Sequence, residues 1–467
     1  MSKLARSIIA IALTVIIWLI PVPAGLKPQA WHLFAIFVGT IAAFILQPYP
    51  MGTISFIAIV VSCLTNTLKI GEALSGFGNS TTWLIVSAFL FARGFIKTGL
   101  GRRIAFVIMQ HFGDSSLKLS YSITLANLIL GPVIPSNTAR NCGVFFPIVN
   151  SLCDVCDSHP GPTARKLGAF LMSAVFHTDL IVSAMFLTSM AANPLMNELA
   201  QKTIGVSLSW TGWAVAACVP GVISLILDPI LVYHLVPPEM KNTPEGPALA
   251  TKELNAMGPM SKEEKYMTCI FIIALVCWIL GTQIKVFGGT TVALMGIALM
   301  LVTGVLDFKD ITEAKDGWNA LIWMGTIIGL AGLLNKVGFI PWFSKLAGAS
   351  LQGMNWMVAV FLAGMIYILS HYFFASMSAH VSAMYAAFAA IAASVGTPPF
   401  LAAFIVAISA NLCGCLTHYS TGPAPVFFGA GYVSQGEWWR NGFIVCMFNV
   451  VIWFGIGSIW WKVLGLW

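Results

Sequence analysis

The sequence predicts an all-α polytopic membrane protein with about 11 transmembrane helices, two re-entrant helical hairpins and an inverted two-fold repeat. Three observations predict this class. The 467 residues are 58% hydrophobic and only 9% charged, whereas a soluble domain has roughly 25% charged residues. Apolar segments recur along almost the whole chain, and some of them are broken by polar residues. Landmarks of the first half return in the second half at a nearly constant spacing.

The apolar segments approach the length of about 20 residues that an α-helix needs to cross a bilayer. The first could pass for a signal peptide because Lys3 and Arg6 precede it, but the many later segments favour an uncleaved first span. The basic residues predict a cytoplasmic N-terminus in the cell inner (cytoplasmic) membrane, with a plastid inner envelope as the less favoured location. Crossings are predicted near residues 6–22, 31–47, 50–68, 80–99, 166–190, 209–236, 265–281, 289–306, 318–338, 398–416 and 437–465.

The polar stretch 135–140 interrupts an otherwise apolar segment directly after a Gly-Pro pair. The apolar arms beside it, about 117–130 and 144–152, are each shorter than a full crossing. Backbone that is unpaired at membrane depth is tolerated only where it lines a cavity or is buried in protein. We therefore expect a re-entrant hairpin over about 116–150, with a tip that suits an anion.

The two halves of the chain repeat each other. Residues 83–99 resemble residues 322–338, at an offset of 239, and the tip Ser136 to Arg140 matches Ser376 to His380, at an offset of 240. Each repeat holds an odd number of predicted crossings, so the second copy must lie upside-down relative to the first. Inverted repeats with broken helices are the layout of secondary transporters, whose substrate site lies near the midplane of the membrane.

Both predicted tips carry neutral hydrogen-bonding side chains. Ser136, Asn137 and Thr138 place two hydroxyls and a carboxamide at the first tip, and Ser376 and Ser378 place two hydroxyls at the second. Such donors can hold a carboxylate oxygen without a permanent charge, which lets the substrate leave again. The alternative is that they only satisfy the backbone of a turn. Their occurrence at matching positions of both repeats favours substrate binding.

Two further breaks would bring helix ends to the same cavity. One contains Asn193, before a proline, and the other contains Thr421 and Pro423. We count these three residues as candidate substrate contacts, although a proline in a transmembrane helix is also often only a kink.

Arg140 and His380 occupy equivalent places, four residues beyond the first serine of each tip. A charge at membrane depth is costly and usually functional, so we interpret the two as clamps, one for each carboxylate of a dianion. His380 could then titrate near neutral pH. The alternatives are that Arg140 snorkels to the cytoplasmic face and that His380 is a neutral core histidine. His177, His371 and His418 rank below His380.

Acidic residues and metal motifs are scarce in the predicted membrane segments. Asp179 and Asp228 are the only apparent intramembrane acids, and neither lies in a hairpin tip. Asp179 is interpreted as structural, so the site is neutral to positive and suits an anion. No phosphate-binding glycine loop or HExxH-type motif occurs, and Cys153 and Cys156 are taken as reduced thiols. We expect no cofactor and no bound metal.

Other function classes fit the sequence less well. The net charge of +7 is dispersed along the chain, so it indicates no nucleic-acid partner. An anion channel could use the same site as a filter, but inverted hairpins argue against it. An intramembrane enzyme would need Ser136 or Ser378 as nucleophile with a histidine base, and no third orienting group is apparent. We therefore expect a transporter and not an enzyme.

The chain resembles the divalent anion:sodium symporter family, and most closely its exchanger branch of bacterial tartrate/succinate and citrate/succinate antiporters and the plastid 2-oxoglutarate/malate translocator. The likeness runs nearly from end to end. The segments that carry it are IPVPAGLKPQAWHLFAIF (20–37), GFGNSTTWLIVSAF (76–89), KTGLGRRIA (97–105), PSNTAR (135–140), HYFFASMSAH (371–380) and GCLTHYSTGPAPVFFGAGY (414–432).

The resemblance implies a homodimer in the lipid bilayer whose mobile parts carry the two hairpins across the membrane as elevators. It also implies that Ser136, Asn137, Thr138, Ser376 and Ser378 bind the substrate. Met377 stands where sodium-coupled relatives have Asn, which puts a second sodium site in doubt. In exchanger relatives, basic side chains at the positions of Arg140 and His380 substitute for the cations.

The function that follows is exchange of di- or tricarboxylates by sodium-independent antiport, with a sodium-coupled dicarboxylate symporter as the alternative. Succinate, malate, fumarate, 2-oxoglutarate, tartrate and citrate all remain open as substrates, whereas sulfate suits two separated cationic residues less well.

The same resemblance divides the chain into scaffold and transport parts. The predicted parts are 1–115 (scaffold, with the first span and the first half of repeat 1), 116–208 (transport, with the first hairpin and a broken span), 209–264 (a span and the inter-repeat loop), 265–352 (scaffold of repeat 2) and 353–467 (transport, with the second hairpin at about 353–394, a broken span and the last span).

Overall fold

The computed structural model describes residues 2–281, 283–350 and 354–467. Within those ranges every regular secondary-structure element is a helix. The predicted all-α class is therefore confirmed. The only pairing of strand type in the described part of the chain is an isolated bridge between Ser115 and Asn242. The predicted boundary between residues 352 and 353 lies outside the described residues.

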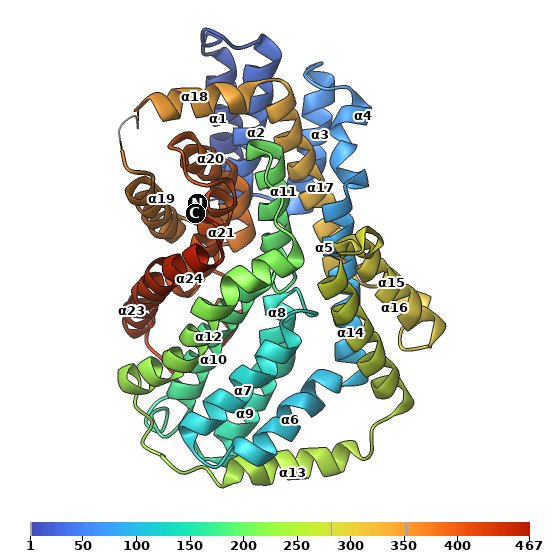
Figure 1. The fold of residues 1–467 in the computed structure, drawn as a ribbon, viewed down its shortest axis with the longest axis vertical. Coiled ribbons are helices and arrows are strands. Elements are labelled where there is room, and N and C mark those ends of the chain that lie inside the picture. Colours follow the sequence, from blue (N-terminus) through green and yellow to red (C-terminus); the bar gives the residue numbers. More distant parts are fainter. Residues whose placement is uncertain (1, 282, 351–353) are drawn as a thin grey trace.

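The first half of the chain runs from a helical N-terminus through a broken hairpin to a long helix that precedes the inter-repeat segment (Figure 1). Its helices are α1 (Lys3–Leu19), α2 (Pro28–Leu46), α3 (Met51–Leu64), α4 (Ile70–Ala73), η1 (Ser75–Gly78), α5 (Ser80–Thr98), α6 (Leu100–Phe112), α7 (Ser116–Leu130), α8 (Asn137–Arg140), the π-helix η2 (Asn141–Phe145), α9 (Phe146–Val155), α10 (Gly168–Met185), α11 (Ala192–Ile204) and α12 (Trp210–Leu235).

The second half repeats this order of elements. Its helices are α13 (Glu245–Met257), α14 (Lys262–Leu280), η3 (Lys285–Phe287), α15 (Gly289–Val302), α16 (Phe308–Thr312), α17 (Lys315–Lys336), α18 (Phe339–Ser350), α19 (Trp356–Ser370), η4 (His371–Phe373), α20 (Met377–Ser394), α21 (Pro399–Leu412), η5 (Cys413–Cys415), α22 (Ala424–Gly429), α23 (Gln435–Val451), the π-helix η6 (Ile452–Ile456) and α24 (Gly457–Val463).

Seven helical segments in the described part of the chain are long and apolar enough to cross a membrane, or eight if the bent pair α5–α6 counts as one span. Several other apolar helices are shorter, among them α3, α7 and α15. The protein is thus a multi-pass membrane protein, while the number of eleven crossings stays a prediction.

Two glycines mark the predicted repeat in the backbone itself. Gly99 ends α5 with φ at 75°, and Gly338, 239 residues later, follows α17 with φ at 92°. Such left-handed conformations favour glycine. Each glycine turns the chain into an arm helix, and the two arms, α6 and α18, lie at opposite ends of the molecule (Figure 1). This placement is that of an inverted repeat.

The segment between the repeats differs from the prediction of a loop over 237–264. It contains the helix α13, which packs along α6. Close packing requires Gly246, because a methyl group there would lie 2.7 Å from the carbonyl oxygen of Gly113. The high polar content of this segment reflects an amphipathic surface helix, which hydropathy alone does not separate from a loop.

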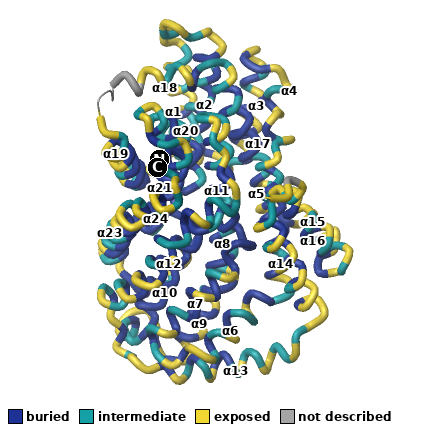
Figure 2. Tube along the Cα trace, in the orientation of Figure 1, coloured by how far each residue is buried: buried dark blue, intermediate teal, exposed yellow. Residues whose placement is uncertain are grey.

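The outer helices expose apolar side chains, as the lipid-facing surface of a membrane protein does. Phe56 and Leu64 on α3 and Phe361 on α19 are examples. By contrast, every residue of α10 is buried, and α21 is buried over most of its length, so these two helices lie in the interior (Figure 2). Both lead into the predicted breaks of the transport parts.

Arg103 and Arg102 form a matched pair of residues for testing which ion pair attaches α6 to the neighbouring helices. The Arg103 guanidinium is mostly buried and donates to both Glu264 oxygens, at 2.6 and 3.1 Å, and to the carbonyl of Gly258. We expect Arg103→Ala to lower the free energy of unfolding by about 3 kcal/mol, because it leaves a buried carboxylate unpaired. Arg102 pairs with Glu253 at the surface, and Arg102→Ala should cost at most about 1 kcal/mol.

Thermal unfolding in detergent checks this difference. Equal stability of the two variants would contradict the assigned role of Arg103.

Candidate substrate site

The first hairpin is broken where the sequence predicts it. Helix α7 ends at Leu130, and the next helical run begins at Asn137. Ser136 caps this second arm, since its hydroxyl accepts a hydrogen bond from the Ala139 N–H at 3.1 Å. Ser136 is half-buried, Asn137 is 9% exposed, and Thr138 is exposed. Ser136 and Thr138 are therefore the accessible residues of the tip.

Arg140 is fully buried behind this tip, and all of its N–H groups have partners within the protein. Its Nη2 lies 2.8 Å from Asp179 Oδ1 and 2.9 Å from the Ser183 hydroxyl. Its Nε donates to Asn127 Oδ1 at 2.6 Å. Its Nη1 donates to two backbone carbonyls, of Ile134 at 2.7 Å and of Ser189 at 2.8 Å. The guanidinium thus ties the first tip to the break that follows α10.

The expectation that Arg140 clamps a substrate carboxylate stays a prediction, and these contacts favour a structural role instead. Neither snorkelling nor a substrate is needed to satisfy the guanidinium, because Asp179 supplies the counter-charge. The predicted structural role of Asp179 agrees with this ion pair. What the sequence could not indicate is that the two charges, on separate helices and 39 residues apart, meet.

The second tip is built in the same way. Ser376 caps α20 by accepting from the Ala379 N–H at 3.4 Å, and Ser376 and Ser378 are both half-buried. His380 points away from the tip and is fully buried. Its Nε2 lies 2.9 Å from the Ser370 hydroxyl and its Nδ1 lies 3.0 Å from Nδ1 of His371. His371, which the sequence ranked lower, is the partner of His380. The expectation of His380 as a second clamp stays a prediction that these contacts do not favour.

The two tips meet at one break of the second repeat. A methyl group on Gly422 would lie 1.9 Å from the Thr138 hydroxyl oxygen, so the first tip sits directly against Gly422. A methyl group on Gly414 would lie 3.0 Å from both the Met377 side chain and the Thr421 side chain, which places the second tip at the same break. Thr421 and Pro423 are buried there.

Thr421 and Asn193 differ in what their polar atoms do. The buried hydroxyl of Thr421 has no hydrogen-bond partner among the described residues, so it is free to bind a ligand. Asn193 is fully buried, and its amide holds the backbone after α10 by donating to the carbonyls of Ser183 and Phe186. Its oxygen accepts from Asn411. These contacts favour a structural role for Asn193, and its contact with the substrate stays a prediction.

The breaks after α10 and α21 share one hydrogen-bond pattern, which refines the alignment of the repeats. The Ser189 hydroxyl donates to the carbonyls of residues 183 and 186, and the Ser420 hydroxyl donates to those of residues 414 and 417. In each case the serine carbonyl accepts from a side chain of the nearby hairpin, Arg140 in one repeat and His371 in the other. Ser189 and Ser420 are thus equivalent.

Asn141 is a candidate that the sequence analysis missed. It is fully buried one residue beyond Arg140, and neither its amide nitrogen nor its oxygen has a hydrogen-bond partner in the described part of the chain. It starts the π-helix Asn141–Phe145, and such π turns occur frequently at functional sites. A polar amide next to the tip was the only signal that could have pointed to it.

A cavity of about 320 Å³ leads to the first tip. Ala139 of the tip borders it, together with Arg93, Lys315, Glu313 and Asp316. A similar cavity of about 330 Å³ is related to it by the repeat, and Gly76, Gly329 and Lys336 line it, but no residue of 135–140 or 376–380 does. Of these two cavities, the one beside Arg93 reaches a hairpin tip.

Inverted repeats of broken helices around a polar interior site define a membrane transport protein of the secondary-transporter class. The comparisons agree with this class. The family described as the sodium:sulfate symporter transmembrane region matches residues 1–467. The fold is also similar to two solved transporters at low sequence identity: YdaH of Alcanivorax borkumensis (12% identity, TM-score 0.56, 99% of this chain and 98% of that chain) and MtrF of Neisseria gonorrhoeae (13%, 0.57, 98% and 94%).

Sequence relatives are much closer. The chain is 51% identical to the putative malate transporter YflS of Bacillus subtilis (strain 168), over 100% of this chain and 97% of the relative. It is 46% identical to the chloroplastic dicarboxylate transporter 1 of Spinacia oleracea, over 97% and 80%. It is 36% identical to the inner membrane protein YbhI of Escherichia coli (strain K12), over 100% and 99%. The chain belongs to the divalent anion:sodium symporter family and is a transporter, not an enzyme.

Proposed function

We propose that this protein exchanges dicarboxylates such as malate, succinate, fumarate or 2-oxoglutarate across the membrane by sodium-independent antiport. The observation that carries the substrate class is the full-length similarity to relatives named malate and dicarboxylate transporters. Tartrate, which is also a four-carbon dicarboxylate, and citrate, a tricarboxylate, remain further candidates. The site geometry supports an anionic substrate, because two helix starts that carry accessible hydroxyl groups meet at one break.

The proposed substrate ligands are the accessible groups of the two tips and the unpaired groups beside them. Ser136 and Thr138 from the first tip and Ser376 and Ser378 from the second would each hold carboxylate oxygens. Thr421 adds a buried hydroxyl without a partner among the described residues. Asn137 and Pro423 contribute to the walls. Arg140 and His380 act as positioning residues that fix the tips.

The surroundings of Arg140 support exchange without sodium. Five oxygen atoms converge on the guanidinium, from Asn127, Asp179, Ser183 and the backbone of residues 134 and 189. Carbonyl, amide, hydroxyl and carboxylate oxygens are also the ligands that hard cations bind. The guanidinium therefore occupies a cage that could otherwise hold a mobile cation. Met377 in place of Asn at the second tip supports the same conclusion.

A sodium-coupled symporter is the second candidate, because the description of the matching family names a sodium:sulfate symporter. The two candidates differ in what drives net uptake. An antiporter needs internal substrate, whereas a symporter needs only a sodium gradient.

Reconstituted vesicles separate the two functions. We expect labelled malate to enter vesicles loaded with malate in sodium-free, potassium-based buffer, and to enter empty vesicles at only the background rate. Excess sulfate should compete weakly, because the two tips offer separated sets of donors. Uptake into empty vesicles that requires an inward sodium gradient would establish the symporter instead.

The remaining expectations follow from the family. We propose a homodimer in the cell inner (cytoplasmic) membrane with a cytoplasmic N-terminus, in which parts 116–208 and 353–467 move as elevators against parts 1–115 and 265–352. Residues 209–264 would link the repeats. The cavity beside Arg93 and Ala139 would then be the cytoplasmic access route.

A further inference from the structure

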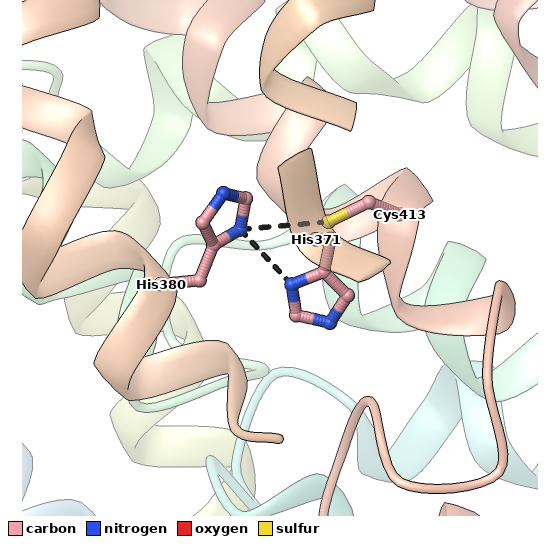
Figure 3. A group of neighbouring side chains, drawn as sticks. All are labelled: His371, His380 and Cys413. Carbon is pink, nitrogen blue, oxygen red and sulfur yellow. Dashed lines mark hydrogen bonds between the residues drawn. The ribbon is translucent and has the colours of Figure 1, made fainter. Parts of the chain in front are cut away.

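His371, His380 and Cys413 form a fully buried cluster between the second hairpin and the following break. His371 lies in η4, just before the tip, His380 lies in the first turns of α20, and Cys413 begins η5 after α21. The two Nδ1 atoms are 3.0 Å apart, and the Cys413 Sγ lies 4.0 Å from Nδ1 of His380. All three possible ligand atoms lie within 4.8 Å of one another, and Figure 3 shows the rings and the thiol facing a common point.

The hydrogen bonds on the far side of each ring determine where the ring protons sit. His371 Nε2 lies 3.1 Å from the Ser420 carbonyl oxygen, which can only accept, so Nε2 carries the proton. The Ser370 hydroxyl donates to the carbonyl of Tyr367 at 2.7 Å, so it accepts from Nε2 of His380. With one proton on each neutral ring, both Nδ1 atoms present lone pairs. Two lone pairs 3.0 Å apart repel each other unless a proton or a metal ion lies between them.

The repeat indicates what that species does. His380 is equivalent to Arg140, and the carbonyl of Ser420 is equivalent to that of Ser189. In the first repeat, a guanidinium joins the hairpin to the break after α10. In the second repeat the corresponding place holds two imidazoles and a thiol, which are ligands and not permanent cations. This repeat therefore has no permanent cation at that place, and a positive charge there requires a bound proton or metal ion.

We propose that His371 Nδ1, His380 Nδ1 and Cys413 Sγ bind one thiophilic metal ion, with Zn²⁺ as the ion that the ligands fit best. Imidazole nitrogen and thiolate sulfur are preferred zinc ligands, and the far-side hydrogen bonds orient both rings as in known zinc sites. Binding displaces the thiol proton, which leaves as H⁺, and replaces the contact of Cys413 Sγ with the Ala410 carbonyl.

The distances favour a site that tightens around the ion. Zn–N bonds of about 2.0 Å and Zn–S bonds of about 2.3 Å at tetrahedral angles give N···N of about 3.3 Å and N···S of about 3.5 Å. The observed 3.0 and 4.0 Å differ from these by about 0.3 and 0.5 Å. His371 Nδ1 and Cys413 Sγ lie within 4.8 Å of each other, and this third pair has to reach the same N···S distance when the ion binds. The absence of a carboxylate from the cluster argues against Mg²⁺ or Ca²⁺, which prefer oxygen ligands.

Metal analysis of the full-length protein, purified in detergent without chelators, tests the site. We expect elemental mass spectrometry to find about one zinc ion per chain, and we expect this zinc to be released only when the protein is denatured. Cys413→Ser and His371→Asn should lose most of this metal. Cys415→Ser is the matched control, because Cys415 is a buried thiol of the same short helix whose Sγ contacts the carbonyls of Leu412 and Gly442. It should keep the metal of the unsubstituted protein.

A spectroscopic measurement makes the test independent of whether the variants fold. Protein produced with cobalt should show the visible bands of a tetrahedral Co²⁺ site with a sulfur ligand. Copper found in equal amount in place of zinc, and lost in the same variants, would support the site with Cu⁺ as its ion. Unsubstituted protein with only trace metal and no cobalt bands would overturn the proposal, as would equal metal loss in Cys415→Ser.

Discussion

Arg140→Met is expected to destabilise the folded protein by about 3–5 kcal/mol, because it leaves the buried Asp179 carboxylate without its counter-charge. The substitution also removes the donors to the carbonyls of Ile134 and Ser189, so the first tip loses its attachment to the break after α10. Thermal unfolding of the purified protein in detergent measures the effect. Transport should fall with the amount of folded protein.

A double-substitution cycle separates this structural role from a direct role in binding. Arg140→Met combined with Asp179→Leu removes both buried charges, and we expect it to be more stable than Arg140→Met alone. Arg140→Met with the stability of the unsubstituted protein but with weak substrate binding would contradict the structural assignment. It would restore the interpretation of Arg140 as a substrate clamp.

Gly422→Ala is expected to reduce substrate affinity by about 10- to 100-fold, the equivalent of one lost hydrogen bond to a charged ligand. The added methyl group would lie 1.9 Å from the Thr138 hydroxyl oxygen, so it must displace that hydroxyl from its position against Gly422. Competition by unlabelled malate in vesicles gives the affinity. Gly429→Ala is the matched control, because nothing lies within 4 Å of a methyl group there.

The same contact predicts that the effects of Thr138→Ala and Gly422→Ala on substrate affinity are not additive. In a Thr138→Ala background the hydroxyl is already absent, so adding Gly422→Ala should cause little further loss of affinity. Losses that multiply in the double variant would mean that Gly422 acts on the site by another route, and the contact between Thr138 and Gly422 would then not matter for binding.

Much of the fold was predictable because helix breaks and internal repeats leave local patterns in the sequence. Proline, glycine and polar residues inside apolar segments located both hairpin tips, and the spacing between Gly99 and Gly338 is the spacing of the repeat. The helix α13 was missed because a polar amphipathic helix has the composition of a loop. The arm helices α6 and α18 were missed for a related reason, since each directly continues a predicted span after one glycine.

The candidate site was less predictable, because function depends on which buried groups meet. Sequence placed Arg140 and His380 at equivalent positions, and that equivalence agrees with the structure. The sequence pattern could not predict which way these two side chains point. Arg140 points inward to Asp179, and His380 points inward to His371. Contacts between helices that are far apart in sequence decide these orientations. The unpaired groups of Asn141 and Thr421 likewise become visible only once neighbours are known.

The central claim is that the two hairpin tips hold the substrate between them. It is tested most directly by placing a cysteine at Thr138 or at Ser378 and measuring its modification by a charged thiol reagent, above the rate of the unsubstituted protein. Gly436→Cys, at an exposed position away from the tips, serves as the control. We predict that malate slows modification at both tips and leaves the control rate unchanged. Protection at neither tip, or at one alone, would contradict the claim.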